Sequence, residues 1–174
     1  MILIWDEDYN ELISFLKGQK EKPFLLCDEN TFNACGKSIV EKLKKEQLDY
    51  DLLILPNDAH ADEKNICKVM LNTGDNHLIV SIGSGSITDI ARFSAYKQKL
   101  RFISVPTAPS MDGYASSVAA LTIDGLKTTV LASAPEKIFA NIEVIKNSPK
   151  ILKLAGFGDL MGKFTALSDW KLAN

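Results

Sequence analysis

Two polar segments, residues 83–86 and 106–116, hold the side chains best suited to chemistry. The first reads Gly-Ser-Gly-Ser between an apolar run and a helical pattern, where backbone N–H groups and the helix dipole favour a pyrophosphate. Gly83 and Gly85 permit positive φ and close backbone approach, and Ser86 can cap a helix that begins at the next residue. An ordinary tight turn between a strand and a helix, without any ligand, could have the same sequence. The second polar segment favours a dinucleotide held across two neighbouring loops.

That second segment follows the next strand-like run. Thr107, Ser110 and Ser116 offer hydroxyl groups, Asp112 offers a carboxylate, and Gly113 supplies a bend that could bring them together. Serine and aspartate also cap turns. Even so, a loop with two prolines at the end of a buried strand favours a functional role.

Two carboxylates have both structural and functional interpretations. Asp89 lies three residues after Ser86, a spacing that matches a reciprocal helix cap. Asp28 follows an apolar run and could accept hydrogen bonds from a ribose, or it could be a turn or N-cap residue. In an ordinary Rossmann fingerprint the glycine turn precedes the acid, whereas here the acid comes first.

The spacing around Asp159 predicts an N-cap at the start of the last helix. A metal ion there would need more ligands, and neither His60 nor His77 is a convincing one. The Gly-Lys-Ser tripeptide at residues 36–38 resembles the end of a Walker A motif. Because Thr31 stands where that motif requires glycine, and the tripeptide lies in a helical pattern, we predict no nucleotide loop there.

Alternating strands and helices should position these loops. Strand-like runs occur at residues 24–27, 50–55, 77–82 and 101–105, with helical patterns between them. This alternation predicts an α/β fold, a Rossmann-like layered and mostly parallel sheet with flanking helices. A capping box is predicted at residues 8–11. Asp-Gly at 124–125 predicts a hairpin that joins residues 121–123 to 126–130.

A helical pattern begins at residue 150 and is interrupted at residues 156–159. It is still running at residue 174, which we interpret as a cut helix. Leu160, Phe164, Leu167 and Trp170 need a partner surface, so we expect self-association through this helix.

The composition narrows the class of protein. With 174 residues, 46% hydrophobic content and a net charge of −2, the chain can bury a core and has no basic field for nucleic acid. Its apolar runs are too short for a membrane span, and its start does not read as a secretory signal. Cys27, Cys35 and Cys67 lack metal-type spacing and indicate reduced thiols in a cytoplasmic protein.

These residues together resemble a known family, the glycerol-1-phosphate dehydrogenases, especially the bacterial type. That family lies within the superfamily of iron-containing alcohol dehydrogenases, glycerol dehydrogenases and 3-dehydroquinate synthases. Residues 83–89 look like the Gly-Gly-Gly-x-x-x-Asp element of the superfamily. Residues 106–116 look like the segment of the phosphate-substrate branch, and residues 155–160 with Asp169 and Trp170 look like its metal-site helix.

The resemblance implies an NAD(P)-binding α/β domain over residues 1–149 and, over residues 150–174, the beginning of a truncated helical metal-binding domain. Asp112 would bind substrate, and Asp159 would be the first ligand of zinc or nickel, completed by two later histidines. Ser84 replaces a family glycine, which leaves the choice of NAD or NADP open. The cofactor would contact Asp28, Gly83, Gly85, Ser86, Asp89, Thr107, Ser110 and Ser116.

The function that the resemblance implies is reduction of dihydroxyacetone phosphate to sn-glycerol 1-phosphate by the intact protein. Asp112 and Asp159 would be its catalytic residues, and a homo-oligomer is expected. The 174 residues alone would be inactive. The alternatives are a glycerol or polyol dehydrogenase, which acts on unphosphorylated substrate, and a nucleotide-binding module without catalysis. A dehydroquinate synthase is less compatible with the loop at 106–116.

Overall fold

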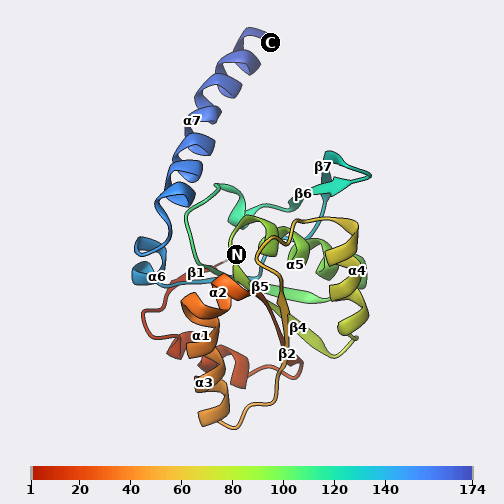
Figure 1. Cartoon of the computed structure of the whole chain (residues 1–174), viewed down its shortest axis with the longest axis vertical. Coiled ribbons are helices and arrows are strands. Elements are labelled where there is room, and N and C mark those ends of the chain that lie inside the picture. Colours follow the sequence, from red (N-terminus) through yellow and green to blue (C-terminus); the bar gives the residue numbers. More distant parts are fainter. Residues whose placement is uncertain (1, 174) are drawn as a thin grey trace.

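A six-stranded parallel sheet forms the centre of the molecule (Figure 1). The computed structural model describes residues 2–173. In spatial order the strands are β1 (Ile2–Trp5), β8 (Lys137–Ala140), β5 (Arg101–Pro106), β4 (His77–Gly83), β2 (Lys22–Asp28) and β3 (Asp51–Leu55). The predicted α/β class is therefore confirmed.

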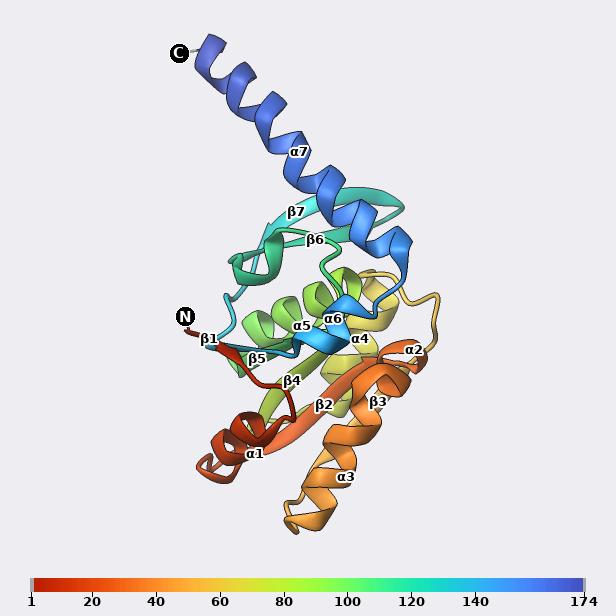
Figure 2. The same ribbon diagram turned by 90° about the vertical axis from the view of Figure 1, so that its left-hand side faces the viewer.

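Helices cover both faces of this sheet, as the edge-on view in Figure 2 shows. One layer contains α1 (Asn10–Lys17) and α3 (Lys37–Lys45), and the other contains α4 (Glu63–Asn72) and α5 (Gly85–Gln98). Successive strand residues point to opposite faces, so Leu25 packs in the first layer's core while Phe24 and Leu26 pack in the second. Burial on both faces explains why the inner strands read as continuous apolar runs.

All four predicted strands are present, but two short strands of the sheet, β1 and β8, were missed. Strand β1 is short and exposed, with Ile2 and Trp5 more than half accessible, and β8 lies at the end of an irregular stretch. Strand β1 has no buried apolar run, and the buried run of β8 is short, covering only Ile138–Ala140, so pairing with distant residues decides their conformation. The register joins Leu3 to Ile138.

The predicted hairpin is confirmed as β6 (Val118–Ile123) and β7 (Leu126–Leu131). Asp124 and Gly125 both have positive φ, at 50° and 76°, as a primed two-residue turn requires. Ala119 and Leu121 are buried in the same core as α5, so the hairpin lies over that helix.

The predicted capping box at residues 8–11 is wrong. Tyr9, in the left-handed region with φ 61°, occupies the N-cap of α1, and Asp6 accepts hydrogen bonds from Glu11 N (3.3 Å) and Leu12 N (2.8 Å). The left-handed turn brings the earlier carboxylate over the first helical turn. The tripeptide at 36–38 is helical as predicted. Its glycine ends a π-helical turn (Phe32–Gly36), and its lysine and serine begin α3. That π-helical turn follows the short α2 (Glu29–Thr31).

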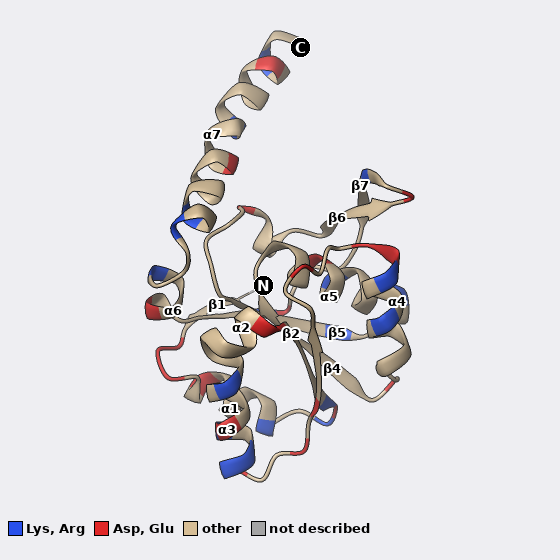
Figure 3. Ribbon diagram, viewed as in Figure 1, with Lys and Arg blue, Asp and Glu red and all other residues tan. Residues whose placement is uncertain are grey.

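After β8 and the short α6 (Ile142–Lys146), the chain enters α7 (Lys150–Ala173), a continuous helix of 24 residues. The predicted interruption at residues 156–159 is wrong, because those residues are helical. None of the described residues of α7 is buried, and Figure 3 shows basic and acidic residues spaced along it. Its exposed apolar side chains are Ile151, Leu154, Phe157, Leu160, Met161, Phe164, Leu167, Trp170 and Leu172. Among residues 2–173, no helix is both long and apolar enough to cross a membrane.

Candidate functional site

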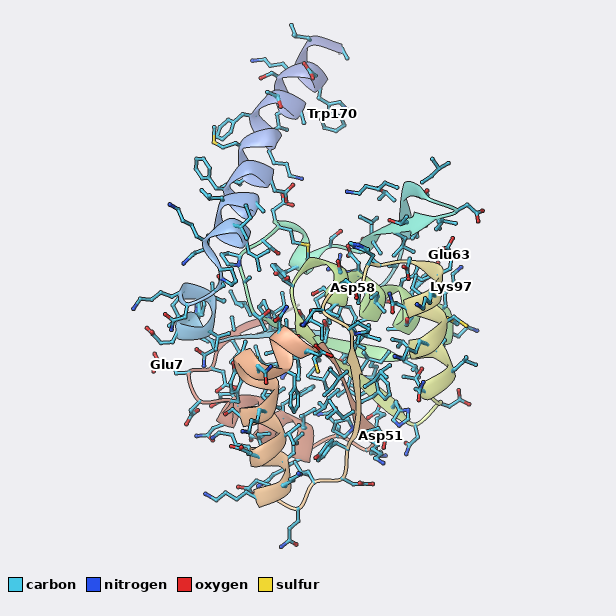
Figure 4. All side chains as sticks on the ribbon, viewed as in Figure 1. Glu7, Asp51, Asp58, Glu63, Lys97 and Trp170 are labelled. Atoms are coloured by element: carbon cyan, nitrogen blue, oxygen red, sulfur yellow. The ribbon has the colours of Figure 1, made fainter. Side chains whose placement is uncertain are left out.

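A cleft of about 980 Å³ lies at the carboxyl edge of the sheet, and all six strands contribute to it. Parallel strands bring their carboxyl ends to one edge, which is where α/β proteins bind ligands. Figure 4 shows Asp58, just past β3, near this edge, and Asp51 at the opposite end of that strand. The polar lining residues at a strand end, or within three residues after it, are Asp8, Asp28, Asn57, Ser84, Thr107 and Asn141.

The start of α5 borders this cleft and is open to an anion. Ser84 is the N-cap, and within the described residues its side chain makes no capping hydrogen bond. The first-turn N–H groups, with the positive end of the helix dipole, therefore face the cleft beside Ser84 and Ser86. The prediction that Ser86 caps a helix beginning at Ile87 is wrong. Strand β4 extends to Gly83, so the helix starts at Gly85.

The two glycines of this loop are not used for positive φ as expected, since Gly125 is the positive-φ glycine of the described chain. A Cβ at Gly83 would lie 2.6 Å from Cβ of Ile87, so this glycine permits close packing of helix on strand. At Gly85 an added Cβ would have Met111 Sδ at 3.7 Å, an ordinary contact. The absence of a side chain at Gly83 is therefore needed for helix–strand packing, while the absence of one at Gly85 leaves space beside the first turn of α5.

Asp28 has the N-cap role that its position allowed. Its Oδ1 accepts from Thr31 N at 2.8 Å, and its own N–H donates to Thr31 Oγ1 at 3.0 Å, which completes a capping box. Asp28 also lines the cleft, so capping and ligand contact are compatible there.

Two residues that line the cleft, Asn57 and Asn141, were not predicted from the sequence. Asn57 Oδ1 accepts from Asn30 N at 2.9 Å, and Asn141 Oδ1 caps α6 by accepting from Glu143 N and Val144 N. Asn57 follows the predicted strand at 50–55, so the rule that ligands bind at carboxyl strand ends would have found it. Asn141 follows β8, which the sequence did not reveal.

In the loop after β5, Thr107 is buried at the cleft, while Ser110 and Ser116 lie outside its lining. Tyr114 crosses the loop, where its hydroxyl donates to Ala108 O at 2.5 Å and lies 3.5 Å from Ser110 Oγ. Ser116 Oγ accepts from the N–H of residue 118 at 3.0 Å. These contacts give the loop a defined shape.

Asp112 and Asp159 are brought together from 47 residues apart. Asp112 N–H donates to Asp159 Oδ2 at 2.9 Å, and Asp112 Oδ2 pairs with Lys163 Nζ at 2.9 Å. The hydrogen bond from Lys163 lowers the pKa of Asp112. Asp159 lies within α7, so its predicted N-cap position is wrong. It docks the helix on the loop instead.

These carboxylates do not by themselves fit a metal ion. A catalytic ion takes about three protein ligands, and among residues 2–173 no three His, Cys, Asp or Glu side chains gather closely enough to hold one. One oxygen of Asp159 is engaged by a backbone N–H, and a lysine lies beside the pair. Any metal at Asp159 would need donors that the described residues do not supply.

Asp89 lies outside the cleft lining. Its predicted reciprocal cap with Ser86 is wrong, because α5 begins at Gly85 with Ser84 at the N-cap. Asp89 Oδ1 lies 3.7 Å from Arg92 Nε. Burial raises the pKa of Asp89 from 3.8 to about 6, against the opposing charge of Arg92.

This raised pKa predicts a pH-dependent stability. Because the folded-state pKa of Asp89 exceeds its unfolded value, its contribution is fully present below about pH 4 and is lost as pH rises through about 6. The free energy of unfolding of the wild type, measured in urea relative to Asp89→Asn, should therefore fall between those two pH values. A difference that stays constant or rises with pH would contradict the assignment.

Of the predicted residues, Asp28, Ser86 and Thr107 line one cleft. Asp112, in the loop after β5, and Asp159, in α7, contact each other outside the cleft lining. This fold and cleft define an α/β protein with a ligand-sized cleft at the carboxyl edge of a parallel sheet, and comparison with known proteins gives its family. Residues 6–149 match the family described as iron-containing alcohol dehydrogenase, and the chain belongs to that family.

Among curated relatives, the chain is 41% identical over 179 residues to a glycerol-1-phosphate dehydrogenase (NAD(P)+) of Geobacillus thermodenitrificans. That match covers 99% of this chain and 44% of the relative, so the chain spans under half of the relative's length. Its fold resembles glycerol dehydrogenase from Schizosaccharomyces pombe, with TM-score 0.76, 22% identity and coverage of 94% and 42% of the two chains. An iron-containing alcohol dehydrogenase from Thermotoga maritima gives TM-score 0.79 at 14% identity, with coverage of 91% and 51%.

Proposed function

We propose that this chain is the nucleotide-binding part of an NAD(P)-dependent sn-glycerol-1-phosphate dehydrogenase. The intact protein would reduce dihydroxyacetone phosphate by hydride transfer. The observation that carries the proposal is one cleft lined by polar residues at or just after the carboxyl ends of all six strands, beside the start of α5, where the Ser84 side chain makes no capping bond. The 41% identity to a glycerol-1-phosphate dehydrogenase over nearly the whole chain supports this choice of reaction.

In this proposal the cofactor lies along the cleft from Asp28 to Thr107. The N–H groups at Gly85 and Ser86 bind the pyrophosphate, as the helix dipole favours. Asp28 uses Oδ1 for its cap, and Oδ2 accepts a ribose hydroxyl. Thr107 lines the same cleft. Ser110, Ser116 and Asp89 lie outside the cleft lining, so their predicted cofactor contacts are not part of this proposal.

Substrate would lie near the junction of the loop and α7. Asp112 orients the triose hydroxyls, and Lys163, which pairs with Asp112, adds a positive charge that suits a phosphate. Residues 1–149 would form the cofactor domain, and α7 would open a second, helical domain. A cytoplasmic location and a homo-oligomer belong to the same proposal.

The first test compares substrates in the intact protein. With NADH or NADPH, kcat/KM for dihydroxyacetone phosphate should exceed that for dihydroxyacetone by about 100-fold or more, since a site built for a polar group rejects the analogue that lacks it. The reverse preference would indicate a polyol dehydrogenase. Cofactor binding by calorimetry without turnover of either substrate would indicate a nucleotide-binding module.

Asp159 as one ligand of zinc or nickel stays a prediction, because the described residues supply no complete donor set. In the intact protein, Asp159→Asn should abolish turnover and lower bound metal, measured by elemental analysis. Lys171→Gln, in the last turn of the same helix, is the control, and it should retain both. Full activity and metal content in Asp159→Asn would refute the role. The 174 residues alone should show no turnover.

A further inference from the structure

Arg92 lies beneath the loop that carries Asp112 and Ser116, and it is 1% exposed. It belongs to α5, seven residues after Gly85, which is about 10 Å along the helix. The same helix therefore begins at the predicted pyrophosphate site and reaches the substrate loop two turns later.

The guanidinium of Arg92 binds three backbone carbonyls of that loop. Nη1 donates to Val118 O at 2.6 Å, and Nη2 donates to Gly113 O at 2.7 Å and to Tyr114 O at 3.1 Å. A planar guanidinium presents several donors in a fixed geometry, which a lysine ammonium cannot reproduce. The bonds reach both ends of residues 113–118, so they fix the loop's curvature as well as its height above α5.

Asp89 balances the buried charge of Arg92. Its carboxylate lies at ion-pair distance from Nε, while Nη1 of Arg92 binds Val118 O at the start of the hairpin. A buried guanidinium without a counter-charge would be costly. The pair therefore ties three parts of the chain together, namely α5, the loop at 113–118 and the hairpin.

We infer that Arg92 is a positioning residue, which holds residues 112–118 at a fixed height over α5 so that substrate and cofactor meet in register. This inference rests on the proposed function for its kinetic consequence. Its structural content, an ordered loop held by one side chain, does not depend on the reaction.

The test is Arg92→Lys in the intact protein, with Arg101→Lys as the matched control. The chain has two arginines, and Arg101 also makes several bonds, to Glu136, Gln19 and Glu21, at the opposite edge of the sheet. In Arg92→Lys, amide hydrogen exchange over residues 113–118 should become about 10-fold faster or more, as expected for loss of bonds to a charged donor. In Arg101→Lys exchange over this segment should not change.

Kinetics separates positioning from general destabilisation. Arg92→Lys should lower kcat/KM for the triose phosphate by about 10-fold or more, because the loop carries Asp112, while the NADH dissociation constant stays within about threefold. A merely structural residue would affect both through the folded fraction. Unchanged exchange in a folded Arg92→Lys protein would overturn the inference, and so would an equal loss of NADH affinity. Faster exchange in a protein that turns over no triose phosphate would sustain it and refute the proposed function instead.

If Arg92→Lys does not fold, the wild-type guanidinium can be observed directly. Bonds to three carbonyls should restrict rotation and give separate nitrogen-bound proton signals for Nη1 and Nη2 of Arg92 in NMR spectra. A single averaged signal would overturn the inference.

Discussion

Gly83→Ala should both destabilise the protein and weaken NADH binding. The new Cβ would lie 2.6 Å from Cβ and 2.9 Å from Cγ2 of Ile87, a buried β-branched residue that cannot rotate away. Strand β4 and the first turn of α5 must then separate, at a cost of about 1–3 kcal/mol in the free energy of unfolding. Since that turn would carry the pyrophosphate donors, the NADH dissociation constant should rise about 10-fold or more.

Two other glycines separate these effects. At Gly85 an added methyl group would be in ordinary van der Waals contact with its neighbours, so Gly85→Ala should keep the wild-type free energy of unfolding in urea. It should lose NADH affinity only if the ligand approaches the backbone at that residue. No described atom lies within 4 Å of a Cβ built at Gly74, so Gly74→Ala should change neither quantity. Calorimetric titration of the three variants with NADH decides the matter. Wild-type affinity in Gly83→Ala would place the pyrophosphate elsewhere.

Gly156→Ala should separate α7 from the loop that it contacts. A Cβ at Gly156 would lie 1.7 Å from Pro109 O and 2.8 Å from Pro109 C, an overlap with backbone that no rotamer relieves. Relief requires moving the helix, which breaks the bond from Asp112 N to Asp159 and the Asp112–Lys163 pair. We expect a loss of about 1–3 kcal/mol in the free energy of unfolding. A marked fall in kcat should accompany it.

Gly158, on the same helix, is the matched control, because no described atom lies within 4 Å of its added Cβ. Gly158→Ala should stabilise α7 by about 0.5–1 kcal/mol, since alanine favours helix over glycine. The two substitutions therefore have opposite expected signs in urea unfolding. Equal stabilisation by both would show that α7 does not rest on Pro109 in solution.

Local patterns were sufficient for much of the fold. The inner strands were recognisable because burial on both faces requires continuous apolar residues. The hairpin was recognisable because Asp-Gly satisfies a turn with two positive φ angles. Strands β1 and β8 carry a weaker signal. Strand β1 is an exposed edge strand, and β8, although buried between β1 and β5, has only four residues, so both are defined by their partners.

Two predicted helix starts near the site, at Ile87 and at Asp159, were wrong because contacts between residues distant in sequence set the helix boundaries. Gly83 pairs with Pro106 in the sheet, which extends β4 by one residue and moves the helix start from Ile87 to Gly85. The position of Asp159 inside a continuous helix likewise depends on contacts with the loop at residues 109–112. Such contacts are made by residues distant in sequence, so spacing along the chain does not encode them.

The sequence by itself determined the α/β class, the polar segments at 83–86 and 106–116, and the resemblance to a dehydrogenase family. Each of these depends on residues close together in the chain. Only the tertiary structure decided that six strand ends share one cleft, that Asp112 meets Asp159, and that Arg92 supports the loop between them. Hydrogen bonds and close packing act over a few ångströms, so these assignments required knowing which distant residues become neighbours.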